Sequence, residues 1–252
     1  MCGRFAITLT PEVFRQAFGY EETPNFPPRH NVAPTQPVPV VLAEHGARHF
    51  RLMRWGFLPG WVKDPKTFPL VINARGETLL EKPTFRAATK RRRCVFLADA
   101  FYEWRRVGRE KAPYAIRAAD GGPLPLAGLW ETYSDASGGE IDTAAIVTTD
   151  ANGTLSAIHD RMPVILDNPG IASWLDVDTV TDRDAMALVR PCADERLRLY
   201  PVSSRVNSVA NDDDTLLTPL AERDPAPESQ PGRTKRENTV RSSDEDGQGS
   251  LF

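Results

Sequence analysis

Residues 37–55 read PVPVVLAEHGARHFRLMRW. This stretch predicts two β-strands, residues 37–43 and 48–55, joined by a short turn that carries an acidic residue. Turn residues such as Asp-Gly-Gly and Ser-Gly-Gly separate further strand candidates. These are residues 70–72, 94–98, 113–118, 124–130 and 143–148. Short strands joined by turns favour antiparallel pairing, so we expect one β-rich α+β domain with mostly antiparallel strands.

Helices are expected to flank the strands. Thr10-Pro11-Glu12 supplies an N-cap, a proline at the first helical position and an acidic first turn, and Gly19 ends the helix. Helical patterns also cover residues 74–82, 83–92, 170–175 and 182–189. We expect this domain to span residues 2–220.

Composition excludes several classes of protein. The chain has 252 residues, 40% of them apolar and 26% charged, which is ordinary for a globular domain. No apolar run approaches the ~18 residues of a membrane span, and the first residues lack a signal-peptide pattern. The three cysteines have neither metal-site nor disulfide-framework spacing. We therefore expect a metal-free protein without cofactor in the reducing cytoplasm.

Charge is divided along the chain. Residues 1–117 carry 20 Lys and Arg against 10 Asp and Glu, whereas residues 118–220 carry 6 against 17. The basic half contains the run at residues 90–93 and a second basic group at residues 105–111. The excess of basic residues in residues 1–117 predicts that the protein binds a polyanion. The alternative is a solvated basic face whose charge the acidic residues of 118–220 neutralise.

Cys2 follows the initiator Met1. Removal of Met1 would expose a 1,2-aminothiol. The α-amino group has a pKa of roughly 8, so part of it is neutral at physiological pH and can attack an aldehyde to give an imine. The adjacent thiol can then close a thiazolidine ring. The alternatives are a merely permissive second residue, or an N-terminal nucleophile that hydrolyses amides.

Three more positions could move protons or bind phosphate. Glu103 lies in an aromatic stretch after a predicted strand, where burial would suit it to acid–base work. His159 lies in a predicted loop beside Asp160 and Arg161, and it could shuttle protons near neutral pH. Asn73 and Arg75 lie where a predicted strand meets a predicted helix, a place that attracts phosphate. Each position has a plainer alternative. Glu103 could form an ion pair with a nearby arginine, His159 could be a structural histidine, and Asn73 could simply cap a helix.

Several tryptophans lie in the same basic half of the chain. Trp55, Trp61 and Trp104, with Pro34 and Pro37 nearby, are candidates for stacking on nucleic-acid bases. Packing in the core is the alternative for each.

Together these segments form a pattern that is more specific than any one of them. In order along the chain they are Met-Cys-Gly-Arg-Phe (1–5), His-Asn-Val-Ala-Pro-Thr (30–35), Met-Arg-Trp-Gly-Phe-Leu-Pro (53–59), Asn-Ala-Arg-Gly-Glu-Thr (73–78), Arg-Arg-Cys-Val-Phe-Leu-Ala-Asp-Ala-Phe-Tyr-Glu-Trp (92–104) and His-Asp-Arg-Met-Pro-Val-Ile-Leu (159–166). The chain resembles the SRAP family over about residues 2–210. The resemblance implies curved antiparallel sheets with flanking helices, and covalent capture of abasic sites in single-stranded DNA.

The resemblance also implies roles for individual residues. Cys2 would form the imine and then the thiazolidine with C1′ of the opened deoxyribose, and Asn73 would position the sugar. Glu103 and His159 would move protons during capture, lyase chemistry and reversal. Gly76 replaces a serine that other members often have, and this difference is expected to be neutral.

DNA contacts are implied outside these four positions. Arg4, Arg75 and Arg161 would hold phosphates that flank the lesion, and Arg86 is a further candidate. Trp104 and Pro37 would wedge or stack at a junction between single-stranded and double-stranded DNA. Because an abasic sugar lacks a base, binding should be largely independent of sequence, and it should weaken steeply with salt.

Residues 221–252 differ from the rest in composition. Few are apolar, so we expect a disordered tail. It ends in Gln248-Gly-Ser-Leu251-Phe252, which resembles the short peptides by which DNA repair proteins bind the replication sliding clamp. We expect Leu251 and Phe252 to fill an apolar pocket of that clamp and Gln248 to bind at its edge.

Two other functions are open at this point. The chain could be an N-terminal-nucleophile peptidase of the SOS response, or a reader of single-stranded or modified DNA without catalysis. In each case we expect a monomer, associated with the nucleoid through DNA if the source is bacterial.

Overall fold

The computed structural model describes residues 2–108 and 110–220, and the predicted tail lies outside them. The strands are β1 (Phe5–Ile7), β2 (Arg29–Val32), β3 (Pro37–Glu44), β4 (Ala47–Trp55), β5 (Asn73–Arg75), β6 (Arg93–Ala98), β7 (Ala100–Val107), β8 (Glu110–Ala118), β9 (Leu124–Ser134), β10 (Glu140–Asp150), β11 (Arg161–Pro163) and β12 (Leu197–Pro201). The α-helices are α1 (Pro11–Phe18), α2 (Pro83–Arg91), α3 (Gly153–Ser156), α4 (Asn168–Leu175) and α5 (Asp182–Ala185). Single 3-10 turns are η1 (Gly76–Thr78), η2 (Met186–Leu188), η3 (Asp194–Arg196), η4 (Ser204–Asn207) and η5 (Asp214–Leu217). The predicted α+β class is confirmed.

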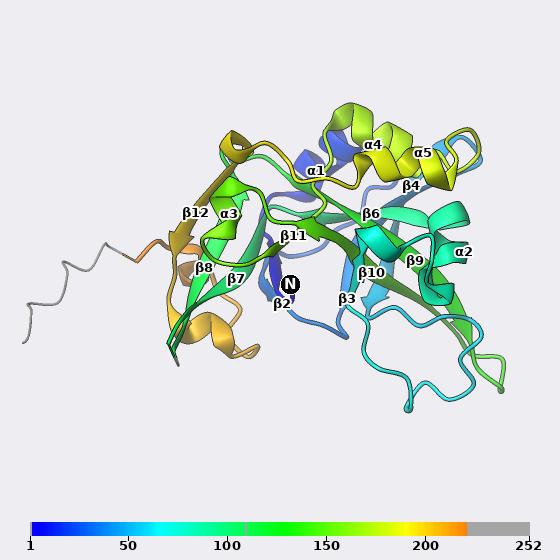
Figure 1. The fold of residues 1–252 in the computed structure, drawn as a ribbon, viewed down its shortest axis with the longest axis horizontal. Helices are drawn as coiled ribbons and strands as arrows, with labels where there is room; N and C mark the ends of the chain where they lie inside the picture. The colour runs from blue at the N-terminus through cyan, green and yellow to red at the C-terminus, as the bar shows by residue number, and fades with distance from the viewer. Residues whose placement is uncertain (1, 109, 221–252) are drawn as a thin grey trace, which may run out of the picture. The chain divides into compact units, whose positions relative to one another are not determined.

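The larger sheet closes on itself. Its pairings run from β10 through β4, β3, β6 and β9 and return to β10. Strand β11 pairs with the second half of β10 (Figure 1), and β5 pairs with the same half on its other side. Pairing is antiparallel except where β10 meets β4 and β5. The long β10 therefore supports both the closed sheet and the short strand that carries Asn73.

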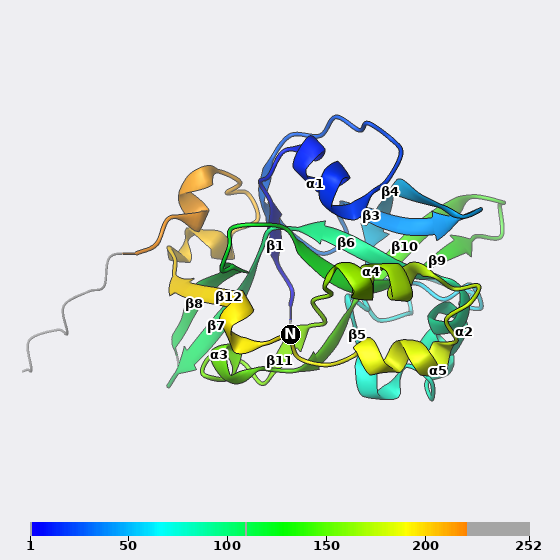
Figure 2. The same cartoon turned by 90° about the horizontal axis from the view of Figure 1, so that it is seen from above.

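The smaller sheet carries the N-terminal strand. Its order is β12-β8-β7-β1-β2, all antiparallel. Strand β1 lies between β2 and β7, and Figure 2 shows it passing beneath α1. A short central strand paired on both edges holds the beginning of the chain firmly, because its backbone groups are satisfied on each side.

Local signals explain the elements that were predicted well. Thr10 Oγ1 accepts a hydrogen bond from Val13 N, and Gly19 adopts a φ of 68° at the end of α1. The hairpin of β3 and β4 turns at His45 and Gly46, both with positive φ. Helices α2 and α4 also lie where they were predicted.

The region around Asn73 differs from the prediction. The strand begins at Asn73 rather than at residue 70, and Val71 makes only an isolated bridge with Phe57. Residues 74–82 do not form a helix but contain the single turn η1. Parallel pairing with β10 keeps residues 73–75 extended, so a helix cannot start there. The predicted phosphate site at a helix N-terminus is therefore wrong.

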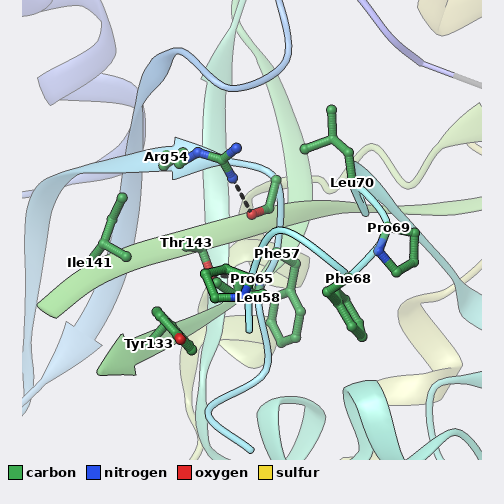
Figure 3. A pocket seen from close by; sticks show the side chains of 11 residues that line it. Arg54, Phe57, Leu58, Pro65, Phe68, Pro69, Leu70, Tyr133, Ile141 and Thr143 are labelled. Atoms are coloured by element: carbon green, nitrogen blue, oxygen red, sulfur yellow. Dashed lines mark hydrogen bonds between the residues drawn. The ribbon is translucent and has the colours of Figure 1, made fainter. Parts of the chain in front are cut away.

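The connection between β4 and β5 encloses a cavity of about 280 Å³ (Figure 3). Its lining is mainly apolar and includes Phe57, Phe68 and Tyr133. Arg54 reaches over it and donates a hydrogen bond to the Gly56 carbonyl at 3.0 Å. Of the residues that the structure describes, none of the four predicted reacting positions lines this cavity.

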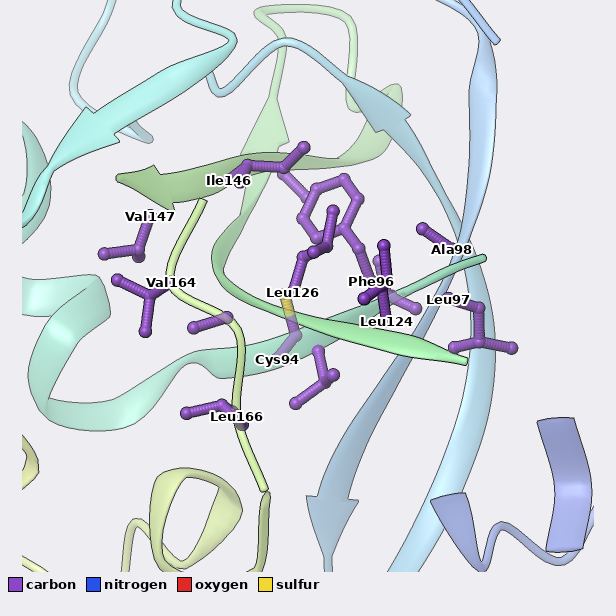
Figure 4. Close-up of a cluster of buried hydrophobic side chains, with 14 of the residues drawn as sticks. Cys94, Phe96, Leu97, Ala98, Leu124, Leu126, Ile146, Val147, Val164 and Leu166 are labelled. Carbon is purple, nitrogen blue, oxygen red and sulfur yellow. The ribbon is translucent and has the colours of Figure 1, made fainter. Parts of the chain in front are cut away.

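The closed sheet is filled by apolar side chains. Every residue of β6 is buried, and Figure 4 shows Phe96 packing with Leu126 and Ile146 from β9 and β10. Burial of a large aliphatic or aromatic side chain contributes about 1.5–3 kcal/mol, so this cluster fixes the positions of the strands that carry the site. No helix in the described ranges is long and apolar enough to cross a membrane.

Candidate functional site

Cys2 lies just before β1 and is fully buried. Its carbonyl oxygen accepts a hydrogen bond from Asn73 Nδ2 at 2.9 Å. Asn73 reaches it because β10 holds β5 beside the N-terminal residues. The Asn73 Oδ1 atom is also buried and accepts no hydrogen bond within the described part of the chain. The structure thus brings Cys2 and Asn73 together, with one polar atom of Asn73 still available.

Glu103 is close to Cys2. It follows β6, the strand predicted before it, and lies within the next strand, β7; it is 3% exposed. Burial raises the pKa of the Cys2 thiol well above its usual range, and the negative charge of Glu103 raises it further. The positive charge of the chain's N-terminus and, to a smaller extent, a backbone hydrogen bond of Arg4 oppose this shift. Burial and the neighbouring carboxylate therefore favour the thiol over the thiolate.

His159 lies in the loop before β11, as predicted. Its Nδ1 atom accepts a hydrogen bond from the Arg161 amide at 3.0 Å and is 2.8 Å from Asp160 Oδ1. The two contacts require opposite protonation of Nδ1. The amide is fixed in the backbone, whereas the Asp160 carboxylate is 87% exposed and so interacts weakly. In this geometry Nδ1 serves chiefly as the acceptor of the Arg161 amide.

Glu103 and His159 line one cavity of about 370 Å³. Sequence reasoning did not find Asn207, whose Oδ1 accepts a hydrogen bond from Trp104 Nε1 at 2.7 Å. Asn207 comes from η4, about a hundred residues after Trp104, and no spacing in the sequence signals this contact. Among the described residues, the lining consists of Glu103, Trp104, Arg106, Lys111, His159 and Asn207.

This arrangement combines a buried N-terminal cysteine with an amide, a carboxylate and an imidazole. The family model of the SOS response associated peptidase (SRAP) matches residues 1–209. The chain belongs to the SRAP family. The resemblance noted from the motifs is therefore confirmed up to residue 209.

Two relatives are named for their activity. Abasic site processing protein YoqW of Bacillus subtilis is 34% identical over 221 residues, which cover 86% of this chain and 99% of that protein. Abasic site processing protein HMCES of Xenopus tropicalis is also 34% identical, covering 84% of this chain and 76% of its own. A solved protein of Bacteroides thetaiotaomicron has a TM-score of 0.79 at 23% identity, covering 87% of this chain and all of its own. That structure shares the SRAP fold.

Two of the arginines that the SRAP resemblance assigns to phosphate are engaged within the protein. Arg4 donates to Asn31 Oδ1 at 2.7 Å and to the Val206 carbonyl at 2.8 Å. These bonds join β1 to β2 and to the η4 turn. Arg4 therefore anchors the segment that leads from Cys2 into β1.

Arg161 is engaged in the same way. Its side chain is 12% exposed and pairs with Glu77 and Asp150, both at 2.7 Å. It also donates to the Thr148 carbonyl at 2.9 Å. A phosphate would have to compete with two carboxylates for this guanidinium, so Arg161 chiefly joins β11, β10 and the η1 turn.

The other predicted contact residues are more accessible. Arg75 at the end of β5 and Arg86 on α2 are exposed. Pro37 is exposed at the start of β3, and its carbonyl accepts a hydrogen bond from Arg29. Trp104 is partly exposed in the cavity with Glu103. These four remain candidates for contact with a ligand.

Arg93 does not belong to the basic surface that the run at residues 90–93 predicted. It is 1% exposed and donates to the carbonyls of Thr89, Trp174, Asp176 and Val180. The run straddles the end of α2 and the start of β6, and the strand turns its first side chain inward.

Gly76 is tightly packed, which does not fit the expectation of a neutral position. A Cβ atom there would lie 2.1 Å from Val189 Cγ1 and 3.1 Å from the Thr148 carbonyl.

We expect Gly76→Ser to lower the free energy of unfolding by about 1–3 kcal/mol, because the short Val189 side chain must move. Urea denaturation would measure it. Gly60→Ser, where a Cβ meets nothing closer than 3.7 Å, is the control and should change little. Equal stability of Gly76→Ser and wild type would contradict this packing.

Proposed function

We propose that this protein processes abasic sites, capturing them in single-stranded DNA as a covalent thiazolidine through Cys2 after Met1 is removed. The observation that carries the proposal is the hydrogen bond from Asn73 Nδ2 to the Cys2 carbonyl, with Glu103 buried close by. The relatives YoqW and HMCES, both named as abasic site processing proteins, support abasic sites as the lesion.

The chemistry assigns a step to each group. The Cys2 amine attacks the C1′ aldehyde of the opened deoxyribose, and the carbinolamine loses one water to give the imine. The Cys2 sulfur then adds to the imine carbon, while the thiol proton passes to nitrogen. Glu103 and His159, which share a cavity, are suited to move these protons and to open the sugar ring. Asn73 holds the reacting residue in place.

The environment of the thiol favours this order of steps. A cysteine peptidase needs a thiolate nucleophile, and such sites lower the pKa of the thiol. Burial and Glu103 here raise it instead. The amine is then the first nucleophile and the thiol the second, which suits an aldehyde better than an amide bond. The same imine could lead to strand cleavage by a lyase route.

Crosslinking to an oligonucleotide with one abasic site tests the proposal. Wild-type protein should form an adduct that survives heating and denaturing electrophoresis. Cys2→Ala should form none, whereas Cys192→Ala, which removes a partly exposed cysteine elsewhere, should react like wild type. A stable adduct of Cys2→Ala at the wild-type level would overturn the proposal. Peptide hydrolysis that survives in Cys2→Ser would favour the peptidase instead.

The proposed sliding-clamp contact rests on residues outside the described ranges. Gln248, Leu251 and Phe252 match a short clamp-binding peptide. Deleting residues 248–252 should abolish binding to the clamp in a pull-down and leave DNA crosslinking unchanged. Equal clamp binding by the shortened chain would contradict the proposal.

A further inference from the structure

The β7–β8 hairpin holds two cations against each other. Arg106 and Lys111 are directly opposite in the antiparallel pair, and both are exposed. Like charges at such positions destabilise a sheet. Within the described residues, neither side chain makes an ion pair or hydrogen bond that would offset this repulsion. The fold alone therefore gives no reason for this pair.

Both cations line the cavity that contains Glu103 and His159. Trp104 precedes Arg106 by two residues on β7, so the two side chains share a face of the strand. The Trp104 indole is held by its hydrogen bond to Asn207. One fixed aromatic ring beside two cations is the combination with which proteins bind single-stranded nucleic acid, since the ring stacks on a base and the cations neutralise the backbone.

Among the lining residues that the structure describes, Glu103 alone is a carboxylate, and it is buried. The exposed lining residues Arg106 and Lys111 are thus basic, whereas the buried lining residue Glu103 is acidic. An anion can bind these two cations without meeting an exposed carboxylate of the described lining. The geometry suits a phosphodiester whose sugar points toward Glu103.

We propose that Arg106 and Lys111 form a phosphate clamp, which binds one backbone phosphate of the DNA strand next to a base stacked on Trp104. This inference rests on the proposed function, because it takes single-stranded DNA as the ligand. It assigns a binding role to the hairpin tip and explains why two like charges are kept opposite each other.

The test measures equilibrium binding of single-stranded DNA that carries an unreactive tetrahydrofuran abasic analogue, by fluorescence anisotropy across a salt series. Arg106→Ala/Lys111→Ala should raise Kd roughly tenfold at low salt, the size expected for a lost charge-assisted contact. The slope of log K against log salt should flatten by about 0.7, the value for one phosphate of a single strand. The matched control is Lys63→Ala/Lys66→Ala, which removes the same charge from an exposed loop outside the cavity and should leave the slope unchanged.

Folding is checked by thermal unfolding. Removing two like charges from an exposed hairpin should leave Tm equal or slightly higher, and Arg106→Lys should retain the wild-type slope because it keeps the charge. A double variant with wild-type Kd and slope would overturn the clamp. So would a slope that changes equally in the lysine control.

Crosslinking by wild-type protein separates this inference from the proposed function. If wild type crosslinks abasic DNA and the double variant binds the analogue normally, only the clamp fails. If wild type forms no adduct but the double variant shows the flatter slope, covalent capture fails and the clamp stands. Absence of wild-type binding to the analogue would overturn the clamp.

Discussion

Glu103→Gln should slow adduct formation with abasic DNA by about 10²–10³-fold. Glutamine has nearly the same shape as glutamate but cannot take up or deliver a proton at the pH of the reaction. General acid–base catalysis contributes effects of this size. Glu103 is 3% exposed beside Cys2 and shares a cavity with His159, so no other carboxylate of the cavity lining can replace it. Single-turnover crosslinking at saturating DNA measures the rate apart from binding.

The control for this variant is Glu131→Gln. Glu131 is another partly buried glutamate, but it lies on β9 and pairs with Arg92. It should crosslink at the wild-type rate. If Glu103→Gln folds normally and reacts as fast as wild type, Glu103 has no part in proton transfer.

Arg93→Ala should lower the free energy of unfolding by roughly 3–5 kcal/mol, comparable to breaking a buried charged network. The substitution leaves four carbonyl acceptors without their donor, on α2, α4 and the segment after α4. It also removes a guanidinium 5.8 Å from the Trp174 ring centroid. In a domain of this size, each 2 kcal/mol of lost stability should lower Tm by several degrees.

Arg91→Ala offers a matched control two residues away. Arg91 belongs to the same basic run but is exposed at the end of α2. Its removal should change stability by less than about 0.5 kcal/mol. Equal stability losses for the two variants would show that the buried network contributes nothing specific.

The parts of the fold that were predictable are those with local causes. Thr10, Pro11 and Gly19 define α1 within ten residues, so the sequence around them suffices. The hairpin of β3 and β4 likewise depends on one local turn, at His45 and Gly46, between two strands that are adjacent in the sequence. Strand β5 could not be predicted, because its three residues are extended only through pairing with β10, some seventy residues later.

The candidate site likewise divides into residues that local motifs identify and contacts that only the folded chain shows. Cys2, Asn73, Glu103 and His159 were found because their motifs resemble a family, and the structure places Asn73 on Cys2 and puts Glu103 with His159 in one cavity. Charge in the sequence did not separate surface arginines from internal ones. Arg93 and Arg161 are engaged by carbonyls and carboxylates from distant segments. Such partners become visible only when the chain is folded.

The most direct test of the account is the intact mass of the protein, alone and after incubation with a single-stranded oligonucleotide that carries one abasic site. The account predicts loss of Met1 and an adduct equal to protein plus DNA minus one water, absent in Cys2→Ala. Protein that has lost Met1 but forms no adduct would contradict covalent capture at Cys2.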